Sequence, residues 1–150
     1  MAGMNYNIPT VLTAEELIDK TFRRASKISK TGTNALDAKK KTSLAKITAA
    51  GDIVVSTLDG YIDRFPRMEK TEDFLPELMD LIVGIDQYKK SLGAVNWVSN
   101  RVEKLKNEAL RETRRTKDPK NLDFIRNGFY GRLSSHINQI SKDLLFLQEA

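Results

Sequence analysis

The sequence predicts an all-α fold, an antiparallel helical bundle of three long helices plus shorter N-terminal and connecting helices. Apolar residues recur at spacings of three and four along most of the 150 residues, which is the pattern of helices that bury one face. No segment alternates between apolar and polar residues with the period of two typical of a strand. The length suits one core, so residues 1–150 are expected to form a single helical-bundle domain.

The first helix is predicted over 13–29. Thr13 is its N-cap and Glu16 follows three residues later, which is the signature of a capping box. The apolar face of this helix consists of Ile18, Thr21, Phe22, Ala25 and Ile28. Spacings of three, four and seven stack side chains on one side of a helix. The opposite face therefore carries the cations Lys20, Arg23, Arg24 and Lys27.

The second helix is predicted over 34–65, beginning at Asn34. Its apolar seam starts near Leu44 and consists of Leu44, Ile47, Gly51, Val54, Leu58, Tyr61 and Phe65. Gly51 is expected to permit a close approach of a neighbouring helix, at some cost in helix propensity. The seam stops before Lys39–Lys41, so the turns that carry these lysines are expected to project beyond the core.

A short third helix is predicted over 72–83, with Thr71 as its N-cap. Pro76 fits only in the first turn of a helix, so a start nearer 75 is the alternative. A fourth helix is predicted over 86–116, opening at Asp86. Its apolar stripe consists of Tyr88, Leu92, Val95, Val98, Val102, Leu105 and Ala109.

A fifth helix is predicted to open at Asp118-Pro119, an N-cap followed by proline at the first helical position. Its stripe runs from Leu122 to Leu147, and nothing in the final LLFLQEA ends it, so we expect the chain to be cut from a longer protein. Packing of the three long helices against one another is expected to bury Leu58, Leu92, Val95, Ile137 and Ile140.

Composition removes several classes of active site. Without cysteine there is no disulfide, thiol nucleophile or thiolate metal site. His136, the single histidine, lacks a partner with which to hold a metal and is interpreted as a boundary residue of the last helix. The chain contains neither GxxxxGK[ST] nor GxGxxG, and no apolar run long enough to span a membrane. We therefore expect no enzyme activity, cofactor, metal or small-molecule substrate in this chain, and a cytoplasmic location.

Trp97 lies off the apolar stripe of its helix. It is expected either to cover a neighbouring helix, such as the first, or to mark a surface for a partner.

The excess positive charge is concentrated in the first third of the chain. Residues 1–46 contain nine Lys and Arg against four Asp and Glu, whereas residues 47–150 contain 16 of each. A surface of one sign attracts phosphates or acidic proteins, although a solvated face is the alternative. A second cluster is predicted at the turn between the fourth and fifth helices, where it either extends the first or lies on another face: Arg111, Arg114, Arg115, Lys117 and Lys120.

Four segments, 10–28, 65–82, 86–96 and 129–148, together resemble the N-terminal helical domain of the nucleolar GTP-binding protein family, of the archaeal type. The most specific pieces are YKKSLG and the pair Gly131-Arg132. In that family the helical domain precedes an Obg-like GTPase domain, and the family acts in assembly of the large ribosomal subunit. The resemblance implies that the parent protein is a GTPase that uses GTP and Mg²⁺, and that a eukaryotic member would be nucleolar.

The resemblance also implies that the helical domain binds ribosomal RNA or a pre-large-subunit particle. No aromatic platform of the kind found in an RRM accompanies the cations, so recognition of backbone and shape is expected rather than recognition of bases. The alternative is a protein-interaction bundle that packs on its own C-terminal GTPase domain or on an assembly factor, without direct RNA contact. The expected RNA-binding residues are Lys20, Arg23, Arg24, Lys27, Lys30, Lys39, Lys40, Lys41, Arg114, Arg115 and Arg132.

Overall fold

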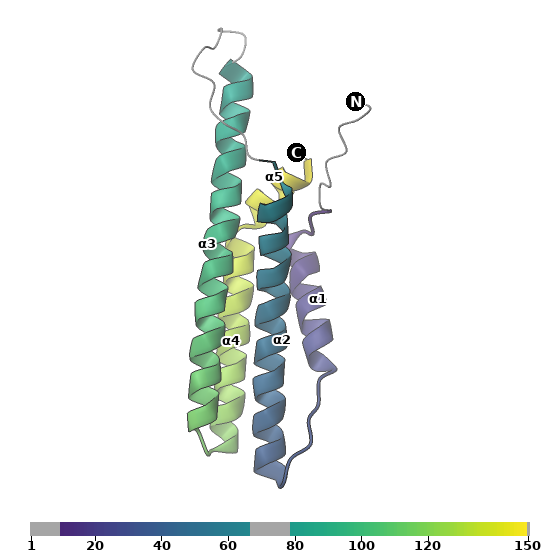
Figure 1. Cartoon of the computed structure of the whole chain (residues 1–150), viewed down its shortest axis with the longest axis vertical. Helices are drawn as coiled ribbons and strands as arrows, with labels where there is room; N and C mark the ends of the chain where they lie inside the picture. Colours follow the sequence, from purple (N-terminus) through teal and green to yellow (C-terminus); the bar gives the residue numbers. More distant parts are fainter. Residues whose placement is uncertain (1–9, 67–78, 150) are drawn as a thin grey trace.

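The computed structural model describes the backbone of residues 10–66 and 79–149, and the side chains of these residues except 79–83. Within this part of the chain every regular element is a helix. The long helices α2, α3 and α4 alternate in direction and lie side by side, α1 lies beside α2, and α5 lies across one end (Figure 1). This arrangement confirms the predicted antiparallel bundle. The helices are α1 (Ala14–Ser26), α2 (Ala35–Arg64), α3 (Met79–Arg115), α4 (Pro119–Gln139) and α5 (Ser141–Glu149).

Three helices begin where the sequence predicts. In α1 the capping box is complete, because Thr13 Oγ1 accepts from the Glu16 N–H at 3.1 Å and Glu16 Oε1 accepts from the Thr13 N–H at 2.9 Å. Asn34 caps α2 by accepting from the backbone N–H of the third helical residue at 2.8 Å. Asp118 caps α4, with Pro119 in its first turn. Each cap pairs backbone N–H groups that the first helical turn leaves unsatisfied.

The predicted break near Asp86 is wrong, because α3 is continuous from Met79 to Arg115. Gly84 and Asp86 are both exposed within this helix. A glycine in a helix costs only about 1 kcal/mol relative to alanine, and an aspartate caps a helix only where the backbone before it has left the helix. The predicted start of a separate short helix, with Thr71 and Pro76, lies outside the described residues.

The predicted last helix is two helices that meet at Ile140. The backbone of Ile140 has φ −102° and ψ 18°, and its N–H bonds to the carbonyl of Ile137 at 3.2 Å, three residues back. After this tightened turn, α5 makes two tertiary hydrogen bonds. Asp143 Oδ1 accepts from Ser91 Oγ of α3 at 2.9 Å, and Gln148 Nε2 donates to the carbonyl of Val11 at 2.8 Å.

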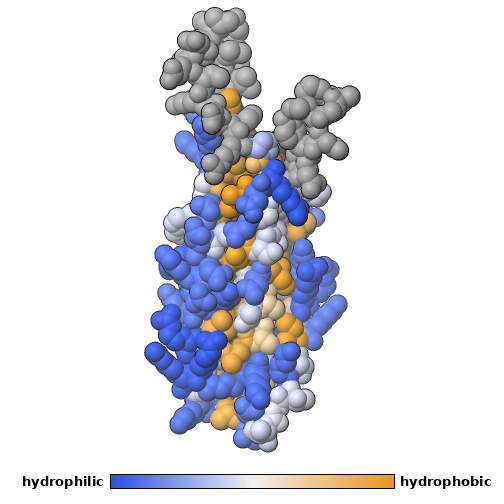
Figure 2. All heavy atoms as spheres, in the orientation of Figure 1, coloured by the Kyte–Doolittle hydropathy of each residue, from blue (hydrophilic) through white to orange (hydrophobic). Residues whose placement is uncertain are grey.

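The apolar stripes form one core along the length of the bundle. Of the five residues expected to be buried, Leu58, Val95, Ile137 and Ile140 are buried, and Leu92 lies half-buried at the edge of the core. Figure 2 shows hydrophilic side chains over most of one face, with apolar side chains exposed in a band along it.

The close approach predicted at Gly51 is confirmed, and its partner is Lys106 of α3. A Cβ atom added at Gly51 would lie 2.7 Å from Cδ of Lys106. The methylenes of Lys106 cross this position and carry its ammonium group to Asp52 at 2.7 Å and Glu103 at 2.8 Å. Gly51 therefore lets an ion pair form across the contact between α2 and α3.

Candidate nucleic-acid interface

Lys30 and Lys39–Lys41 of the first cation cluster lie at the same end of the bundle as the second cluster. In Figure 1, α2 begins, α3 ends and α4 begins at the lower end of the molecule. We call residues 30–43 and 111–126 together the basic end. These residues contain ten Lys and Arg against four Asp and Glu. Their net charge of +6 exceeds the +5 of the whole chain, so the rest of the chain is slightly acidic. The second cluster therefore extends the first.

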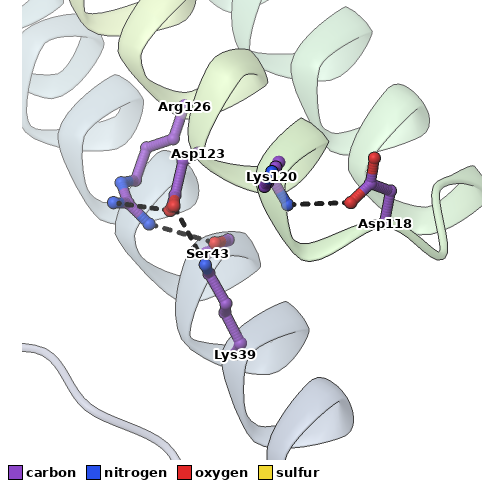
Figure 3. Close-up of polar contacts among 6 residues, drawn as sticks. All are labelled: Lys39, Ser43, Asp118, Lys120, Asp123 and Arg126. Carbon is purple, nitrogen blue, oxygen red and sulfur yellow. Dashed lines mark hydrogen bonds and ion pairs between the residues drawn. The ribbon is translucent and has the colours of Figure 1, made fainter.

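Lys39 is held at the basic end by a carboxylate from α4. Its Nζ atom donates to Asp123 Oδ2 at 2.9 Å (Figure 3). Arg126 donates to Asp123 Oδ1 at 3.3 Å and to Oγ of the buried Ser43 at 3.1 Å. The hydrogen bond from Lys39 lowers the pKa of Asp123, which keeps this carboxylate charged. Lys39, expected to bind RNA, thus has a structural role in joining α2 to α4.

Lys41 also has a carboxylate partner. Asp37, one turn before it on α2, lies 3.0 Å from its Nζ atom. Asp37 also accepts from the backbone N–H of Thr33 at 2.9 Å. This backbone hydrogen bond, and then the one from Lys41, lower the pKa of Asp37. Part of the positive charge at the start of α2 is therefore neutralised within the protein.

The other expected RNA-binding residues divide by position. Lys30, Arg114 and Arg115 are exposed at the basic end, and Lys40 is half-buried there. Lys20 is half-buried and lines a separate hollow with residues of the last turns of α2. The remaining exposed cations lie higher along the bundle, on α1, in the segment that follows it and in the middle of α4: Arg23, Arg24, Lys27 and Arg132.

Two aromatic side chains on α3 and α4 are exposed to solvent. Trp97 of α3 is 56% exposed, and its ring packs in a T-shaped arrangement with the ring of His136 of α4, with centroids 5.7 Å apart. Trp97 therefore contacts a neighbouring helix, α4, and His136 is the half-buried boundary residue predicted. Phe124 is 77% exposed and was missed. In the sequence, Phe124 could have been recognised as a large apolar residue that lies outside the stripe containing Leu122 and Ile125.

We expect the Asp123 carboxylate to contribute to stability in a pH-dependent way. Its folded-state pKa is lowered, so this contribution is present above the usual value of 3.8 and is lost as the pH falls below it. Asp123→Asn should therefore reduce stability at pH 7 and flatten the acid limb of stability against pH. Denaturant unfolding between pH 7 and pH 2 measures both effects. Asp63→Asn, at an exposed acid near the other end of α2, is the matched control; equal behaviour of the two variants would contradict the role of Asp123.

These features define a helical domain that presents a cationic surface at one end of an antiparallel bundle. A sequence model of the NOG1 N-terminal helical domain matches residues 6–150. The chain belongs to this family, and the resemblance to nucleolar GTP-binding proteins is confirmed. No helix among the described residues is long and apolar enough to cross a bilayer. In the same part of the chain no three His, Asp or Glu side chains gather as a metal site.

The relatives are longer proteins. An uncharacterised protein of the archaeon Methanocaldococcus jannaschii is 32% identical over 151 residues, which cover 95% of this chain and 42% of the relative. Nucleolar GTP-binding protein 1 of Encephalitozoon cuniculi is 27% identical over 71% of this chain and 20% of its own length. The protein of the same name from Kluyveromyces lactis is 22% identical over 95% of this chain and 23% of its own length. The chain thus spans less than half the length of these relatives.

Proposed function

We propose that this chain is the ribosomal-RNA-binding N-terminal domain of a GTPase that acts in assembly of the large ribosomal subunit. The observation that carries the proposal is the basic end, where two sequence-distant cation clusters meet. The names of the relatives support the rest of it. GTP, Mg²⁺ and GTP hydrolysis are assigned to the parent protein, outside this chain. The site of action is the cytoplasm, or the nucleolus in a eukaryote.

The physical basis of binding is release of counterions from RNA phosphates. Lys30 comes from the segment before α2, Lys40 from the start of α2, and Arg114 and Arg115 from the end of α3, so one surface can contact several phosphates. The N-termini of α2 and α4 lie at this end and add partial positive charge, part of which the C-terminus of α3 at the same end cancels. Lys39 and Lys41 have carboxylate partners and contribute less to this attraction.

The test is the salt dependence of binding to fragments of large-subunit ribosomal RNA, measured by fluorescence anisotropy. Contact with about six phosphates predicts a loss of affinity of about 10³-fold between 50 and 200 mM salt. Weak binding with a flat salt dependence would contradict the proposal. In that case, salt-insensitive binding to the parent protein's GTPase domain would favour the protein-interaction alternative.

A further inference from the structure

We propose that a hollow between α3 and α4, beside the basic end, binds one unpaired RNA base stacked on Phe124. The inference rests on the proposed function and deepens it, because it adds recognition of a base to recognition of phosphates. Phe124 is 77% exposed, against 56% for Trp97 and 49% for Leu145, the other exposed large apolar side chains of the described residues. A phenylalanine this exposed adds little to the core.

The hollow has room beside the Phe124 ring. Phe124, Gly128 and Arg132 line it from α4, while Glu108, Ala109 and Glu112 line it from α3. A Cβ atom added at Gly128 would have no neighbouring atom within 4 Å. The wall one turn beyond Phe124 is therefore open, and Ala109 opposite it is small. This open wall leaves space beside the phenyl ring that a planar group can approach.

The charges along α4 suit a nucleotide strand. Lys120, Phe124, Gly128 and Arg132 follow one another at intervals of four, so they form one row on the surface of the helix. Each step along the row is about 6 Å, which places Lys120 and Arg132 about 18 Å apart. Both cations are exposed. Along the helix axis, Lys120 lies about 6 Å from Phe124 on one side and Arg132 about 12 Å from it on the other. They can bind phosphates of one strand before and after a base that stacks on the ring, the combination found in proteins that bind single strands.

The carboxylates of Glu108 and Glu112 favour a base over a phosphate within the hollow itself. A phosphate between them would be repelled, whereas a carboxylate accepts hydrogen bonds from exocyclic amino groups such as N4 of cytosine. Adenine, cytosine and guanine carry such a group and uracil does not. The hollow is therefore expected to prefer an unpaired adenine, cytosine or guanine to an unpaired uracil.

The test compares a fully paired RNA hairpin with the same hairpin carrying one bulged adenine, bound to the whole chain. Wild type should bind the bulged hairpin more tightly. Phe124→Ala should remove this preference, a loss of about 5- to 150-fold for one base–aromatic stack, and leave the salt slope unchanged because no phosphate contact is lost. Phe124→Trp should keep the preference. Trp97→Ala is the matched control at an exposed aromatic residue outside the row, and should behave as wild type.

Each other outcome overturns the base site. Equal binding of both hairpins by wild type, with a steep salt slope, would leave phosphate binding standing and the base site wrong. A Phe124→Ala variant that still prefers the bulged hairpin to the paired one would also show that the base site is wrong. If Phe124→Ala lost binding to the parent protein's GTPase domain and kept wild-type RNA binding, Phe124 would be a contact for that protein domain and not for a base. If wild type binds neither hairpin nor the ribosomal RNA fragments, the proposed function fails, and the base site fails with it.

Discussion

Replacing Phe129 by alanine is expected to lower the free energy of unfolding by about 3–5 kcal/mol. Phe129 is 1% exposed and heads the fully buried side chains of the described residues when they are ordered by volume. It lies on α4, which packs against α1, α2 and α3, so little of the resulting cavity can close. A loss of this size is a large fraction of the stability of an ordinary domain. Denaturant unfolding at pH 7 measures it.

Phe124→Ala is the matched control for this measurement. The two phenylalanines lie five positions apart on one helix, but Phe124 is 77% exposed. Its truncation is expected to change the free energy of unfolding by no more than about 0.5 kcal/mol. Similar losses at both positions would show that Phe124 is packed and would remove the reason to assign it to a ligand.

The sequence predicts helix starts well because their causes are local. The caps at Thr13, Asn34 and Asp118 each involve residues no more than three positions away, so the pattern in the chain and the hydrogen bonds in the structure coincide. The buried stripes are predicted for the same reason, since a helix places every third or fourth residue on one face. Leu58, Val95 and Ile137 are buried as expected.

Helix continuity is harder to predict, because a glycine within a helix costs little and because distant contacts can accompany the end of a helix. Gly84 and Asp86 look like a boundary, but α3 continues through them. At Ile140 the apolar spacing is unbroken and the helix nonetheless ends. The bend at Ile140 accompanies hydrogen bonds from α5 to Ser91 and to the carbonyl of Val11, which lie far away in the sequence. No local pattern around Ile140 contains that information.

The sequence identifies the cations of the candidate site, whereas the partners of these cations become visible only when the helices are packed together. The lysines and arginines are visible in the sequence, but the carboxylate that holds Lys39 lies 84 residues away on another helix. Phe124 was missed because one apolar residue outside a stripe is common on protein surfaces. Its place beside Glu112 and Arg132 appears only once α3 and α4 are packed together.

Reversing four cations of the basic end is expected to separate RNA binding from folding. The variant carries Glu in place of Lys30, Lys40, Arg114 and Arg115. No ion pair is formed by these side chains within residues 10–66 and 84–149. Lys30, Arg114 and Arg115 are exposed and Lys40 is half-buried. Surface charges away from special features each change stability by no more than about 0.5 kcal/mol, so the melting temperature should move little. If each cation contacts a phosphate, the salt slope becomes shallower by about four and binding weakens for every RNA sequence alike.

The control reverses four exposed cations elsewhere in the molecule, Lys89, Lys90, Arg101 and Lys142, and so makes the same change in net charge. If only long-range attraction mattered, the two variants would lose affinity equally, and high salt would abolish the difference of each from wild type. Contact at the basic end predicts instead that only the first variant loses salt slope. Wild-type salt dependence in the first variant would make the basic end a solvated face, and the protein-interaction bundle would then be the better account of this domain.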